Sequence, residues 1–139
     1  MKRFIMIAVM AICAIGVWAA SPKLACAEFI EKCKRSKDVE RVVISTGTDS
    51  YYRSVNIENN PTLLGEMRRA VEKDRKLASN TVESYRGGGE EESVILNIPS
   101  NGYLINIGLS VRGNGCASLF VEGNPGAFKS VSYTHLRAH

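Results

Sequence analysis

Apolar residues recur at helical spacing in two stretches of the chain. In residues 28–37 a few apolar residues, Cys33 among them, share one side of a helix, while charged residues occupy the others. In residues 61–79 apolar residues recur three, four and seven positions apart. Asn60 and Pro61 stand in the order of an N-cap residue followed by a proline in the first turn. This pattern predicts a short helix and a longer one, each with one apolar face.

The C-terminal third has the pattern of three antiparallel strands joined by tight turns. Asn101-Gly102 and Asn114-Gly115 accept the positive φ values that short hairpin turns require. In the middle run apolar residues alternate with small or polar ones, so one face of that strand is apolar. The predicted strands are residues 93–98, 103–111 and 116–122.

Earlier segments add strands to this meander. A β-branched run in residues 40–46 predicts one strand, and residues 81–86 predict another that leads into an acidic loop at 87–92. Residues 47–60 are polar and rich in turn formers, which predicts either an irregular loop or an edge strand. The predicted fold is α+β, with two helices packed on one face of a small antiparallel sheet that ends in a three-stranded meander.

The N-terminal segment has the features of a signal peptide. Two basic residues at positions 2 and 3 precede an apolar run at 4–20, and Ala25-Cys26-Ala27 forms a small-x-small cleavage pattern. We expect residues 1–27 to be removed by a cut after Ala27. Two alternatives stay open: an uncleaved anchor, and a lipoprotein signal with acylation at Cys26.

The last nine residues differ in character from the rest. Residues 131–139 resemble the translation of a transposon-end sequencing adaptor, and the alternative is an ordinary polar tail. We therefore expect a single α+β domain at residues 28–130, truncated at its C-terminus, followed by a non-native tail at 131–139.

Charge and histidine content exclude several functions for residues 28–130. The whole chain carries a formal charge of +4, but residues 28–130 hold 14 basic and 14 acidic side chains, so no nucleic-acid partner is expected. Both histidines, His135 and His139, lie in the tail, which excludes histidine-based nucleophilic systems and histidine-bearing zinc sites from the domain. We predict no catalytic, cofactor-binding or metal site.

Four residues are candidates for other roles. Cys33 and Cys116 could form one disulfide in an oxidising compartment, or they could be buried thiols. Tyr51 and Tyr52 form an aromatic pair with polar tips, which is favoured at interfaces, although anchoring of the loop in the core is the alternative.

The order of elements resembles a known family. The segments Phe29-Ile30-Glu31-Lys32-Cys33 and 38–45, together with the terminal run 119–124, resemble domain of unknown function 4252. That family consists of small secreted or lipid-anchored proteins, mainly of Gram-negative bacteria. The resemblance covers the two ends of the domain, whereas residues 46–61 depart from it. It implies an exported location and an α+β fold, and it implies no active site.

These observations predict an uncharacterised exported domain, periplasmic or secreted or lipid-anchored in the envelope, that acts by binding and is not an enzyme. The partner is unknown, with an envelope protein as the candidate, and membrane contact is expected only through the signal peptide or a lipid anchor. The alternative is a small exported hydrolase-type enzyme that uses carboxylate, serine or tyrosine chemistry.

Overall fold

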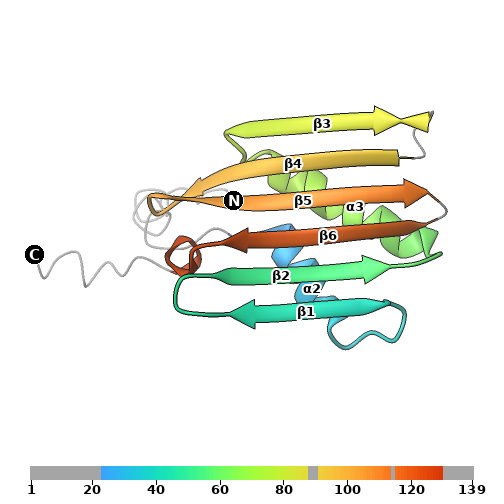
Figure 1. Cartoon of the computed structure of the whole chain (residues 1–139), viewed down its shortest axis with the longest axis horizontal. Helices are drawn as coiled ribbons and strands as arrows, with labels where there is room; N and C mark the ends of the chain where they lie inside the picture. Colours follow the sequence, from blue (N-terminus) through green and yellow to red (C-terminus); the bar gives the residue numbers. More distant parts are fainter. Residues whose placement is uncertain (1–22, 88–90, 114, 130–139) are drawn as a thin grey trace, which may run out of the picture.

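The computed structural model describes residues 23–87, 91–113 and 115–129. Within them, two helices cover one face of a six-stranded antiparallel sheet (Figure 1). The strand order is β1-β2-β6-β5-β4-β3, and every neighbouring pair is antiparallel. The elements are α2 (Ala25–Cys33), β1 (Arg41–Thr46), β2 (Tyr51–Ile57), α3 (Pro61–Arg75), β3 (Asn80–Arg86), β4 (Glu91–Ser100), β5 (Tyr103–Gly113), β6 (Cys116–Gly123) and the 3₁₀ turn η3 (Pro125–Phe128).

The α+β class is confirmed, and the sheet is larger than predicted. Residues 47–60, for which the sequence predicted either an irregular loop or an edge strand, contain β2. This strand lies inside the sheet, between β1 and β6. Its side chains at Val55 and Ile57 are fully buried. β2 becomes an inner strand because β6 pairs with it along its whole length, from Tyr51 to Ile57. The composition of residues 47–60 does not predict this long-range pairing.

Helix α3 begins where its capping pattern predicts. The Asn60 side chain accepts a hydrogen bond from the Leu63 amide at 3.0 Å, and Pro61 occupies the first turn. The helix ends at Arg75 rather than at residue 79. The chain must leave the helix there because the Ser79 amide already donates to the Asn97 carbonyl at 2.8 Å, at the start of the pairing of β3 with β4.

Helix α2 is displaced from its predicted position. It begins at Ala25 instead of residue 28 and ends at Cys33 instead of residue 37. Leu24 and Cys26, which the sequence assigned to the signal peptide, are buried with Phe29 and Ile30 in the core. Residues 1–22 of the predicted signal peptide and the predicted tail at 131–139 lie outside the described residues.

The core lies between the helices and the sheet. Alternate residues of β4, β5 and β6 point into it, and the two helices contribute their apolar faces. Among the described residues, no helix combines the length and apolar composition needed to cross a bilayer. The largest fully buried apolar side chains include Ile30, Ile57, Met67, Leu96, Ile98, Ile105, Ile107 and Leu119.

Candidate functional site

The candidate site is the face of the sheet opposite α2 and α3, which we call the open face. In Figure 1 this face is turned toward the viewer, and both described helices lie behind it. Along β4 the residues Val94, Leu96 and Ile98 are buried beneath the helices, whereas the intervening residues alternate to the open face. Ile95 is one of these and remains 40% exposed.

Strand register arranges the open face into three rows that run across all six strands. Side chains that are directly opposite one another on neighbouring strands lie about 5 Å apart. The amide row is Asn80, Asn97, Asn106, Glu122, Tyr52 and Ser45; the apolar row is Val82, Ile95, Gly108, Phe120, Ser54 and Val43; the serine row is Ser84, Ser93, Ser110, Ser118, Asn56 and Arg41.

Hydrogen bonds connect the three asparagine side chains of the amide row. The Asn80 amide nitrogen donates to the Asn97 side-chain oxygen at 3.1 Å, and the Asn97 nitrogen donates to the Asn106 oxygen at 2.6 Å. Such a chain holds the amides in one orientation across three strands. The amide row is therefore an ordered polar border of the apolar row.

Phe120 dominates the middle of the open face. Its ring lies directly over Gly108 on β5, where any Cβ atom would overlap the ring. Tyr52 stacks beside it, with ring centroids 6.4 Å apart and an interplanar angle of 15°. Two shallow hollows flank the ring, one toward Val43 on β1 and the other toward Ile95 on β4. Gly108 thus allows an aromatic ring to lie flat on the sheet.

The two adjacent tyrosines predicted as a contact surface lie on opposite faces. Tyr52 belongs to the open face, as the amide row shows. Tyr51 points to the helical side, where its ring stacks on Phe128 with ring centroids 3.7 Å apart. The guanidinium carbon of Arg53 lies over the same ring, 4.1 Å from its centroid. Burial raises the pKa of the Tyr51 hydroxyl above its usual range. Only Tyr52 is placed to meet a partner on the open face.

The cysteines considered for pairing also lie on opposite sides of the sheet. The alternation of β6 puts Cys116 on the same side as Ser118 and Phe120. Cys33, the last residue of α2, is buried on the helical side of the sheet. Burial raises the pKa of the Cys33 thiol. The Cys33–Cys116 disulfide stays a prediction.

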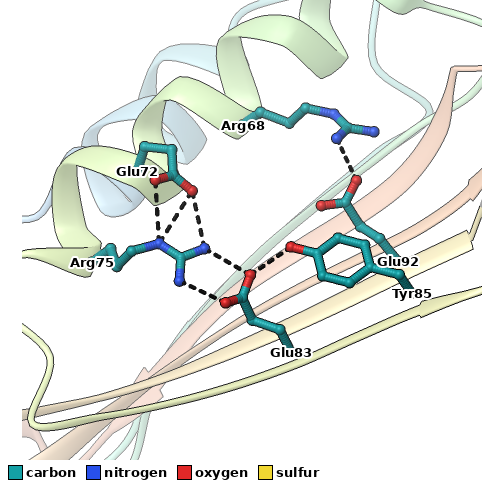
Figure 2. A network of polar contacts seen from close by, with 6 residues as sticks. All are labelled: Arg68, Glu72, Arg75, Glu83, Tyr85 and Glu92. Atoms are coloured by element: carbon teal, nitrogen blue, oxygen red, sulfur yellow. Dashed lines mark hydrogen bonds and ion pairs between the residues drawn. The ribbon is translucent and has the colours of Figure 1, made fainter. Parts of the chain in front are cut away.

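A network of charged residues fastens α3 to the edge strand β3 on the helical side of the sheet (Figure 2). The Arg75 guanidinium contacts Glu72 at 3.0 Å and Glu83 at 3.1 Å. The Tyr85 hydroxyl donates to Glu83 at 2.5 Å. The hydrogen bonds from Arg75 and Tyr85 lower the pKa of Glu83 below its ordinary range. Each charge in this network faces an opposite charge, so we interpret the network as one that stabilises the packing of α3 against β3.

A second ion pair joins the same elements. Arg68 on α3 pairs with Glu92 on β4, beside the first network (Figure 2). The sequence predicted Glu92 within an acidic loop at residues 87–92. Instead Glu91 and Glu92 begin β4, and Arg68 and Arg75 bind the sheet. The signal was present in the sequence, because glutamates on two strands complement arginines on the helix between β2 and β3.

Replacing Arg75 with glutamine is expected to raise the pKa of Glu83 toward its ordinary value, because the main hydrogen-bond donor to the carboxylate is lost. Since the folded-state pKa of Glu83 is depressed, the carboxylate stabilises the fold above its unfolded pKa of about 4.3, and this contribution disappears as the pH falls through the folded-state pKa. Carboxyl NMR titration measures the shift. The control is Lys73→Gln, which removes one charge from the same helix outside the network; a Glu83 pKa equal in both variants would contradict the assignment.

Two carboxylates outside these rows approach each other closely. Glu58 forms a side-chain hydrogen bond with Glu40, which raises the pKa of Glu40, while Arg112 and Arg41 act in the opposite direction. A pair of neighbouring carboxylates is one arrangement that the carboxylate chemistry considered from the sequence would need. Both side chains are exposed. Within residues 23–87, 91–113 and 115–129, no group of three or more histidine, cysteine or acidic side chains could hold a metal ion.

Comparison with known proteins gives a family without an assigned activity. Residues 13–106 match the model of a family of unknown function, DUF6108. The domain is thus one of unknown function, as the resemblance implied, but the matching family is not domain of unknown function 4252. No curated protein and no solved structure matches the chain. Because the match spans well over half of the 139 residues, the chain belongs to the family of unknown function DUF6108.

Proposed function

We propose that this protein is an exported cell-envelope domain that binds another protein through the open face of its sheet. The observation that carries the proposal is the apolar row with a polar row on each side. Protein interfaces have this anatomy, with an apolar, often aromatic centre and a polar rim. Val82 and Ile95 remain 54% and 40% exposed in the apolar row, and Phe120 lies at its middle.

The side chains of the three rows favour a neutral protein surface as the partner. The amide and serine rows consist mainly of uncharged side chains, with Glu122 and Arg41 as their charged members. A nucleic acid or an anionic membrane would call for clustered lysines and arginines. Export is supported by the basic and apolar composition of residues 2–20, with a periplasmic, secreted or lipid-anchored location.

Site-specific photo-crosslinking in cells tests this proposal. A photoreactive amino acid replaces Ile95 on the open face in one variant and Leu77 in a matched variant, since these side chains are 40% and 44% exposed. We expect an adduct with an envelope protein from position 95 and none from position 77. A second substitution, Val82→Ser, should reduce the adduct from position 95 because it removes a neighbouring apolar side chain.

Three outcomes would contradict the proposal. Equal adducts from both positions would mean that the open face has no special role. An adduct with twice the mass of the chain would identify self-association, and the absence of any protein adduct from position 95 would exclude a protein partner on this face.

A further inference from the structure

We propose that residues 24–27 stay in the mature protein as the beginning of α2, so that the export signal is removed upstream of Leu24. This inference rests on the proposed export of the protein. It replaces the expected cut after Ala27 with an earlier one, and it leaves Cys26 as a core residue rather than a lipid attachment point.

Residues 24–27 are an integral part of the hydrophobic core. Leu24 is 3% exposed and Cys26 is fully buried, and both belong to the same core cluster as Ile30. Ala25 and Ala27 pack against this cluster. A segment destined for removal before the protein works would have no reason to fill the core of the final fold.

The buried carboxylate of Asp74 on α3 binds the start of α2 directly. Asp74 is only 2% exposed, and its two oxygens accept hydrogen bonds from the backbone amides of Ala25 and Cys26, each at 2.8 Å. The first amides of a helix have no partner inside that helix, and its N-terminal end favours a negative charge. The N-cap residue, Leu24, supplies no side-chain hydrogen bond. Asp74 therefore caps α2 from another helix.

A cut after Ala27 would dismantle this arrangement. It would remove both backbone donors to Asp74 and leave a buried carboxylate without them. It would also take away the first three of the nine residues of α2 and two side chains from the core. Signal removal acts on the unfolded chain, so burial does not block such a cut. Such a cut would instead lower the stability of the folded product.

Acylation of Cys26 conflicts with the same geometry. Its side chain is fully buried within the core cluster, and its backbone amide is engaged by Asp74. A diacylglycerol group on the sulfur would have to pass through that packed core to reach a membrane. Upstream, the apolar run ends in the small residues Ala19, Ala20 and Ser21, which include a small-x-small pattern. The family match, which begins at residue 13, includes residues 24–27.

The test is the intact mass of the full chain, expressed with its own N-terminal segment in a bacterial host and purified from the envelope fraction. We expect a shortened product that begins after Cys13 and no later than Leu24, and that carries no lipid. Alkylation under denaturing, reducing conditions should modify three cysteines, namely Cys26, Cys33 and Cys116, whereas a product beginning at Glu28 has only two. The two readouts are independent of each other.

The contrary outcomes are distinguishable. A product that begins at Glu28, or at a lipid-modified Cys26, would overturn this inference while supporting export. An uncut chain that stays in the cytoplasm would overturn both this inference and the proposed export.

Discussion

Replacing Asp74 with alanine is expected to lower the free energy of unfolding by about 3 kcal/mol. Two hydrogen bonds to a charged group are lost, and two helix amides, one buried and one partly buried, are left without their acceptor. Domains of this size are stable by only about 5–15 kcal/mol, so the loss is a large share of the total. Urea denaturation measures it as a lower midpoint at an unchanged slope.

Two variants at and beside this position separate the capping role of Asp74 from general damage to α3. Asp74→Asn keeps one acceptor oxygen and should lose about half as much as Asp74→Ala. Lys73→Ala changes the exposed neighbour and should stay within about 0.5 kcal/mol of the unsubstituted chain. Equal losses for Asp74→Ala and Lys73→Ala would show that the carboxylate does not support α2.

Replacing Gly115 with alanine is expected to lower the free energy of unfolding by about 2–3 kcal/mol. The causes are backbone strain at a positive φ and overlap of the new Cβ atom with fixed backbone atoms. Gly115 has φ +72°, and a Cβ atom there would lie 2.7 Å from the Asn60 backbone nitrogen. That nitrogen donates to the Gly115 carbonyl at 3.1 Å, so it cannot move away without losing the bond. The same urea titration measures the effect.

The other Asn-Gly pair of the sequence, Asn101-Gly102, offers a matched control. Gly102 has φ +83°, but a Cβ atom there would meet nothing within 4 Å. Gly102→Ala should therefore cost only the backbone strain, about 1 kcal/mol. If both substitutions lowered the free energy of unfolding equally, the contact between Gly115 and Asn60 would not contribute to the stability of the fold.

Features that depend on neighbouring residues could be predicted. The start of α3 follows from Asn60 and Pro61, because an N-cap acts on amides two and three positions ahead. The turn at Asn101-Gly102 follows from the positive φ values that these two residues tolerate. The apolar alternation of β5 likewise predicts which of its residues face the core.

Features that depend on residues far apart in the sequence could not be predicted. The start of α2 is decided by Asp74, 48 residues after Cys26, and the small residues around Cys26 resemble a cleavage site when considered alone. Tyr51 and Tyr52 are equivalent in composition, and only the pairing of β2 with β6 assigns Tyr52 to the open face.

The candidate site shows the same division. The sequence by itself determined the alternating strands, the tight turns, the capped helix and the absence of histidine from residues 28–130. The amide, apolar and serine rows exist only in the assembled sheet, because each row takes one residue from each of six strands. Strand register, which aligns Phe120 with Gly108 and Asn97 with Asn106, was decided by tertiary structure, since a shift of one residue would move every side chain to the other face.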